Sequence, residues 1–171
     1  MHAKDVLIDG FGRIREEVHA AVDGLAPDRL AARPAPDANS VGWLVWHLTR
    51  VQDDHVAGAF GLDQVWLAQG FEKAFALGLG RRDTGYGHSS AQVAKVRVDS
   101  ADRLTGYYDA VHEQTLAALH TMTAKDLERV VDERWEPPVT LGVRLVSVLS
   151  DALQHVGQAA YVRGLLQSAA A

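Results

Sequence analysis

The 171-residue sequence contains no cysteine, and this absence removes several kinds of chemistry at once. The chain itself can form no disulfide framework, supply no thiolate metal ligand and offer no cysteine nucleophile. Basic runs interleaved with aromatic residues are also missing, and the formal net charge of −5 argues against a nucleic-acid module. No apolar run approaches the roughly 20 residues of a membrane span, and residues 1–12 lack the apolar core of a signal peptide. We therefore expect a cytoplasmic protein that binds neither nucleic acid nor membrane.

What the sequence does contain is helical periodicity. Hydrophobic residues make up 47% and charged residues 23%, which is ordinary for a globular protein, and we expect one domain over residues 1–171. Apolar residues at helical spacing predict four long amphipathic helices, at about residues 4–25, 40–60, 101–122 and 140–167. Shorter helical turns are expected at residues 26–30, within 64–79 and at 123–127, and an extended crossover at 130–139. The pattern predicts an all-α four-helix bundle with longer middle connections.

The last predicted helix carries two parallel lines of residues. One line is apolar throughout, as expected of a face packed on other helices, and consists of Leu145, Leu149, Ala152, Val156 and Ala159. The neighbouring line is polar in its middle, where Asp151, His155 and Gln158 follow one another. A carboxylate and an imidazole one turn apart can hold one metal ion between them, although the same two groups can also form a buried hydrogen-bonded pair. A catalytic metal site would need a third ligand from another helix.

Two histidines of the second predicted helix compete for that third position. His47 follows the strongly apolar stretch Trp43–Trp46, whereas His55 continues the line of core residues, and periodicity does not choose between them. The Gly-rich stretch 78–90 is predicted to be a long loop, and such loops are more often functional than idle. His88 in this loop is either solvent-exposed or a residue that reaches substrate over the open end of the bundle. We interpret His112 and His120 as surface or partly buried residues.

A resemblance to a known family favours one of these alternatives. The stretch 42–48 (Gly-Trp-Leu-Val-Trp-His-Leu) together with Asp151-x-x-x-His155-x-x-Gln158 resembles the DinB-like superfamily. Within it, the chain is similar to the branch of mycothiol-dependent S-transferases and maleylpyruvate isomerase over nearly its whole length, including the crossover at 132–142. The resemblance implies a four-helix bundle that binds one divalent metal, zinc or nickel, through His47, Asp151 and His155. Aspartate at position 151 departs from the family, in which many members have histidine and the isomerase branch has glutamate.

The same resemblance implies an enzyme that uses the metal to activate a low-molecular-weight, mycothiol-like thiol. The thiol would take part in S-transfer to, or isomerisation of, a small electrophilic substrate. We expect Gln158 to orient His155, and His88 and Arg163 to contact substrate, with Arg163 either meeting an anionic group or remaining a solvated surface residue. The alternative is a non-catalytic metal- or ligand-binding stress protein with the same fold. A homodimer associated through helix faces is expected.

Overall fold

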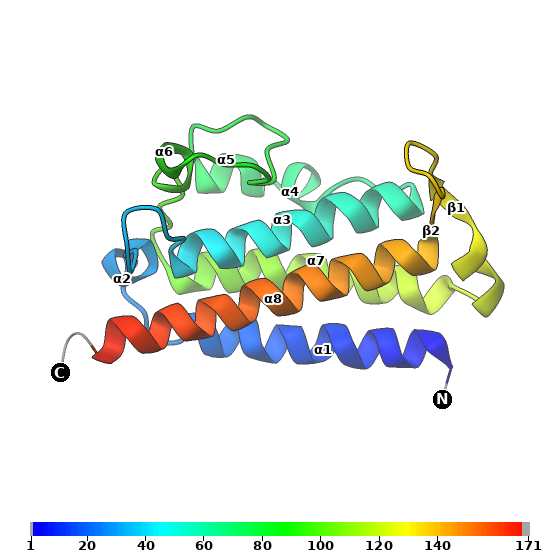
Figure 1. Cartoon of the computed structure of the whole chain (residues 1–171), viewed down its shortest axis with the longest axis horizontal. Helices are drawn as coiled ribbons and strands as arrows, with labels where there is room; N and C mark the ends of the chain where they lie inside the picture. Colours follow the sequence, from blue (N-terminus) through cyan, green and yellow to red (C-terminus); the bar gives the residue numbers. More distant parts are fainter. Residues whose placement is uncertain (1, 169–171) are drawn as a thin grey trace.

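Four long helices run side by side in the computed structural model, which describes residues 2–168 (Figure 1). They are α1 (Ala3–Val22), α3 (Val41–Phe60), α7 (Ala101–Thr121) and α8 (Leu141–Ser168). Each lies within a few residues of its predicted position, and the all-α four-helix bundle is confirmed. Residue 1 and residues 169–171, which complete the predicted domain, lie outside the described part of the chain.

The core forms where the apolar stripes of these helices meet. α8 packs against α3 and α1, and α7 packs against the same two helices from the other side. On α8, the predicted inner line is buried at Leu145, Ala152, Val156 and Ala159 and partly buried at Leu149. No described helix combines the length and the hydropathy that a membrane crossing requires.

Shorter elements connect the long helices. Four are helical: α2 (Pro27–Ala31), α4 (Val65–Ala68), α5 (Phe71–Phe75) and α6 (Ser90–Val93), and a 3₁₀ turn, η1, spans Ala124–Glu128. The predicted extended crossover is a small antiparallel hairpin of β1 (Val130–Asp132) and β2 (Val139–Thr140). Pairing gives these extended residues the backbone partners that a lone crossover strand would lack.

The beginning of α3 is fixed by a side-chain cap. The side chain of Ser40 accepts a hydrogen bond from the backbone N–H of Trp43 at 3.2 Å, which satisfies one of the free donors of the first turn. The helix ends at Gly61, whose φ of 68° lies in the left-handed region favoured by glycine. These two ends fix the length of α3.

A fully buried ion pair ties α3 to its surroundings. Arg50 and Asp53 have no exposed side-chain area, and both bind the hydroxyl of Tyr107, at 3.1 and 2.8 Å. The carboxylate of Asp53 also accepts from the first backbone N–H groups of α4, at Val65 and Trp66. Burial raises the pKa of Asp53. Arg50 uses its Nε to hold the carbonyl oxygen of Asp83, in the loop that lies beside α3.

Candidate metal centre

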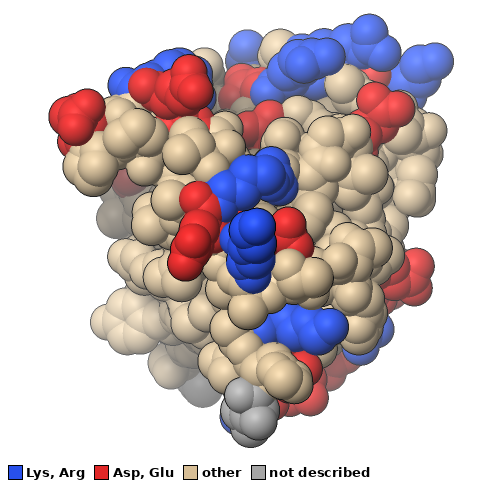
Figure 2. All heavy atoms as spheres, turned by 90° about the vertical axis from the view of Figure 1, so that its right-hand side faces the viewer, with Lys and Arg blue, Asp and Glu red and all other residues tan. Residues whose placement is uncertain are grey.

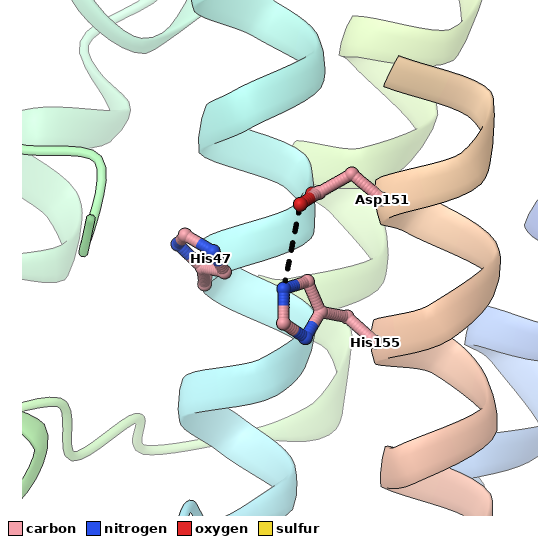
Figure 3. Close-up of side chains that lie close together, drawn as sticks. All are labelled: His47, Asp151 and His155. Carbon is pink, nitrogen blue, oxygen red and sulfur yellow. Dashed lines mark ion pairs between the residues drawn. The ribbon is translucent and has the colours of Figure 1, made fainter. Parts of the chain in front are cut away.

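Three side chains from two helices converge at mid-height of the bundle. His47 comes from α3, and Asp151 and His155 from α8 (Figure 3). Each offers one donor atom, and these atoms lie within 4.8 Å of one another. Nε2 of His155 is 3.5 Å from Oδ1 of Asp151, and the two imidazole rings have their centroids 4.7 Å apart. The shorter aspartate side chain therefore still reaches the two histidines.

The ring of His47 is held in one orientation and one tautomer. Its Nδ1 donates to the carbonyl oxygen of Thr84 at 2.5 Å, because a carbonyl can only accept, and this leaves the lone pair on Nε2. Trp43 stacks on the ring with a centroid distance of 4.6 Å and an interplanar angle of 16°. Burial lowers the pKa of His47, so the neutral form that binds metals is favoured.

His155 is oriented in the same way by a neighbour on its own helix. Its Nδ1 donates to Oε1 of Gln158 at 2.9 Å, which again leaves Nε2 directed at Asp151. The carboxylate of Asp151 raises the pKa of His155. Both histidines thus have an oxygen partner on Nδ1, the arrangement that metal-ligating histidines commonly show.

The donor set fits a divalent cation. Oδ2 of Asp151 is buried and has no hydrogen-bond partner within residues 2–168, although a buried carboxylate oxygen normally has one. Burial raises the pKa of Asp151, but the adjacent His155 and His47 outweigh this effect and hold it below its ordinary value. An ionised carboxylate beside two imidazoles is a ligand set that zinc and nickel accept, and a bound cation would displace the proton that Asp151 favours on His155. A bound cation would satisfy the unpartnered oxygen.

The long loop supports this centre from the side. Arg50 holds its backbone at Asp83, the carboxylate of Asp83 accepts from the N–H of Gly85 at 2.8 Å, and Thr84 between them binds His47. The loop therefore lies against the middle of α3. We had expected it over the open end of the bundle. The sequence marked this loop as functional through its length and glycine content, but nothing local singled out Thr84 or Gly85.

The side chains of His88 and Arg163 both bind groups of the protein itself. His88 has 3% of its side chain exposed, and its two ring nitrogens bind the indole N–H of Trp43 at 3.1 Å and the carboxylate of Asp83 at 2.9 Å. Both nitrogens already have partners, so the expectation of a solvent-exposed His88 is corrected, and its contact with substrate stays a prediction. Arg163 donates at 2.6 Å to the carbonyl oxygen of Ala20, one of the last free carbonyls of α1. It therefore joins α8 to α1, away from the metal centre.

Two other histidines are also placed by the structure. His55 lies two helical turns from His47, and its Nδ1 accepts from Arg144 at 2.8 Å. It is not part of the group that converges on Asp151 and His155. His112, interpreted as a surface or partly buried residue, is 7% exposed and its Nδ1 has no partner among the described residues. It is buried because α1 packs against that face of α7.

Comparisons with known proteins give the family. Residues 6–168 match the family model described as mycothiol-S-transferase. A comparison with curated proteins finds no match. Among solved structures, the chain is similar to a conserved protein from Enterococcus faecalis, with 32% sequence identity, a TM-score of 0.92 and coverage of 98% of this chain and 99% of the other. The chain belongs to the mycothiol-S-transferase family, a DinB-like family, as the residues around His47 and Asp151 led us to expect.

Proposed function

We propose that this protein is a divalent-metal-dependent enzyme that joins a low-molecular-weight, mycothiol-like thiol through its sulfur to a small electrophile, or uses that thiol to isomerise the electrophile. One observation carries the proposal: two imidazoles whose Nδ1 is already bound to oxygen lie with Asp151 in one group of donor atoms within 4.8 Å of one another, and Oδ2 of that carboxylate has no hydrogen-bond partner among the described residues. Membership in the mycothiol-S-transferase family supports a thiol as substrate. The chain has no cysteine of its own, so the reacting sulfur would come from that thiol.

Each residue of the centre has a distinct task in this proposal. His47, Asp151 and His155 would hold zinc or nickel, and Thr84 and Gln158 fix the two imidazoles so that they present Nε2. When bound, the metal would lower the pKa of a coordinating thiol and so supply a nucleophilic sulfur near neutral pH. Asp151 contributes one negative charge, which partly neutralises the cation. The stacked Trp43 excludes water from one side of His47.

We also propose a cytoplasmic homodimer. The outward face of α8 exposes the apolar residues Val143, Val146 and Leu153, which carry no charge between them. Exposed apolar residues on one helix face are typical of a contact with another protein surface, and a twofold axis would pair such a face with itself. Light scattering of the purified protein measures the mass directly, and a monomeric mass would contradict this part of the proposal.

Metal content tests the ligand assignment. The protein should be purified without a chelator or a His-tag, beside His47→Ala, Asp151→Ala and His55→Ala. We expect about one zinc or nickel per chain, lost in the first two variants and retained in the third, since a three-ligand site does not survive the loss of one ligand. Equal loss in His55→Ala would show that the third ligand has been misassigned.

A second measurement separates an enzyme from a binding protein. In cobalt-substituted protein, a thiol that coordinates the metal changes the visible absorption spectrum. We expect such a change on addition of thiol, followed by consumption of thiol when an electrophile is supplied. An unchanged spectrum with a fully loaded site would favour the non-catalytic metal-binding alternative.

A further inference from the structure

The two halves of α3 surround their histidines with different kinds of side chain. In the second half, His55 accepts from Arg144, which also binds the carboxylate of Asp132 in the hairpin, at 2.8 and 2.9 Å. Figure 2 looks onto this hairpin end of the molecule, where acidic and basic side chains lie next to one another. In the first half, His47 lies instead against the aromatic ring of Trp43. The orientation of His47 therefore depends in part on how that ring is held.

One indole contacts both histidines of the candidate centre. Trp43 precedes His47 by four residues, so the two rings lie on the same face of α3, stacked with a centroid distance of 4.6 Å and an angle of 16°. The same indole lies edge to face with the ring of His155 on α8, at a centroid distance of 6.3 Å and an angle of 88°. A shift of this indole would therefore disturb both imidazoles.

Stacking by itself does not fix the position of the indole. Aromatic pairs are found over centroid distances of about 4.5–7 Å, so two stacked rings can slide over one another. A hydrogen bond has a direction as well as a distance, and an indole has one donor, its Nε1–H. In Trp43 this donor is bound by Nδ1 of His88 at 3.1 Å. The bond to His88 thus restrains the indole in the directions that stacking leaves free.

His88 can bind Trp43 in one tautomer only. The indole N–H is a donor, so Nδ1 of His88 must carry the lone pair. The proton is then on Nε2, which faces both carboxylate oxygens of Asp83, at 2.9 and 3.0 Å. Trp46 stacks on the same imidazole with a centroid distance of 5.9 Å and an angle of 22°. His88 is therefore itself fixed, both in position and in the direction of its hydrogen bonds.

The other end of this path of contacts is anchored in the core. The backbone carbonyl of Asp83 accepts from Nε of Arg50 at 3.1 Å, and the side chain of Arg50 is fully buried. The carboxylate of Asp83 also accepts from the N–H of Gly85 at 2.8 Å, which holds it toward His88. Hydrogen bonds thus lead from a buried guanidinium through Asp83 and His88 to Trp43.

We propose that His88 is a positioning residue for the metal centre: it holds the indole of Trp43, and that indole fixes the imidazoles of His47 and His155. The inference rests on the proposed function in one respect, because it takes these two imidazoles as metal ligands. It deepens that function by assigning part of the metal affinity to a loop residue that is not among the three converging ligands.

Two amide substitutions separate the two hydrogen bonds of His88. In His88→Asn, the amide oxygen takes the place of Nδ1 and can still accept from Trp43, but the donor to Asp83 is lost. In His88→Gln, the longer side chain places its amide nitrogen near the position of Nε2, where it can donate to Asp83, and no acceptor remains for Trp43. Both side chains are uncharged amides, so the variants differ mainly in which hydrogen bond survives.

Zinc affinity and the visible spectrum of cobalt-loaded protein should be measured for both variants. We expect His88→Gln to bind zinc about ten-fold or more weakly and to change the cobalt spectrum, because loosened imidazoles alter the geometry around the ion. His88→Asn should stay within about three-fold of the unmodified protein and keep its spectrum. The reverse order would show that His88 acts only by holding the loop through Asp83. That result, equal losses in both variants, or no loss in either would overturn the proposal.

Trp43→Phe tests the same link from the other side and does not require the His88 variants to fold. Phenylalanine keeps an aromatic ring beside His47 but has no N–H, so the bond to His88 is removed. We expect zinc affinity to fall by about ten-fold, and His88→Gln to cause no further loss in this background, because both substitutions break the same bond. Full affinity in Trp43→Phe, or additive losses in the double variant, would contradict the proposal.

His112→Gln is the matched control. His112 is also a buried histidine that stacks on an aromatic ring, that of Tyr108, but it lies on α7 and is not among the three converging ligands. Zinc affinity and the cobalt spectrum of this variant should equal those of the unmodified protein. A loss as large as that in His88→Gln would show that replacing any buried histidine has this effect, and the assignment would be wrong.

A measurement on the metal-free protein separates this inference from the proposed function. Nitrogen NMR of the imidazole rings should show His47 as a single Nδ1–H tautomer in the unmodified protein and as a mixture of tautomers in His88→Gln. If the unmodified protein binds no metal, the proposed function fails, and this comparison alone decides the role of His88. If His47 keeps one tautomer in His88→Gln and in Trp43→Phe, the positioning role is overturned and the proposed function stands.

Discussion

Gly85 lies directly against the metal-ligand candidate His47. A Cβ atom built on Gly85 would be 2.8 Å from Nδ1 of His47, closer than real Cβ contacts. The φ angle of Gly85 is 89°, in a region that residues with a side chain rarely adopt. Only glycine at this position lets the loop approach closely enough for the carbonyl of Thr84 to bind the ring.

Gly85→Ala should therefore loosen the metal centre. The added methyl group would displace either the loop or the imidazole and break the Thr84–His47 hydrogen bond, which we expect to weaken metal binding by about ten-fold or more. Gly87→Ala is the control, because Gly87 also has a positive φ of 69° but a Cβ there would meet nothing within 4 Å. Calorimetric titration measures the zinc affinity of both variants. Equal affinities in the two variants would contradict the role of the close contact.

Gln158→Leu tests the orientation of the second histidine. Removing the acceptor of the His155 Nδ1 hydrogen bond frees the ring to rotate, and we expect metal affinity to fall by about 10- to 100-fold. The free energy of unfolding of the metal-free protein should stay nearly constant, because Gln158 is exposed. Gln154→Leu is matched, since Gln154 is an exposed glutamine on the same helix that binds only Ser150. If both variants retain full affinity, Gln158 does not position His155.

Asp53→Ala should be strongly destabilising. The substitution leaves the guanidinium of Arg50 fully buried without its countercharge and removes the acceptor for two backbone N–H groups of α4. The loss of one partner of a buried ion pair costs about 3–5 kcal/mol in the free energy of unfolding. Denaturant titration measures this cost. Asp9→Ala, which breaks the exposed Asp9–Arg13 pair, should leave the unfolding midpoint unchanged.

His112 should make the stability of the metal-free protein depend on pH. Burial lowers the pKa of His112, and Arg15 lowers it further, while Asp109 and Glu113 act in the opposite direction. Below the ordinary histidine pKa of about 6.5, the unfolded chain takes up a proton that the folded chain refuses. The free energy of unfolding therefore falls as pH falls through this region and is unaffected at higher pH.

His112→Phe should remove this contribution. The ring of His112 stacks against Tyr108, and its buried Nδ1 has no partner in the described part of the chain, so an apolar ring of similar shape avoids the cost of the unpaired nitrogen. Between about pH 5 and 8, the free energy of unfolding should change less with pH in the variant than in the unmodified protein. One proton can contribute about 1.4 kcal/mol per pH unit, and the difference in slope should be part of that amount. Identical slopes would show that His112 titrates normally in the folded protein.

The positions of the helices and one half of the candidate metal centre followed from the sequence alone. A period of 3.6 residues and the cap at Ser40 are local properties of the chain, and so they define the four helices without knowledge of their packing. The proximity of Asp151 and His155 is also a local property, because residues four apart on one helix share a face in any tertiary structure. Resemblance to the family selected His47, and the structure brings it to the same point.

Only the tertiary structure decided which distant groups meet. Periodicity could not separate His47 from His55, because the choice depends on how α3 is aligned against α8: the alignment places His47 beside Asp151 and His55 beside Arg144. The contact of His88 with Trp43, 45 residues away, and that of Arg163 with Ala20, 143 residues away, could not be predicted from the sequence. Hydrogen-bond partners at such separations are set by the packing of whole helices and loops, which no local pattern in the sequence records.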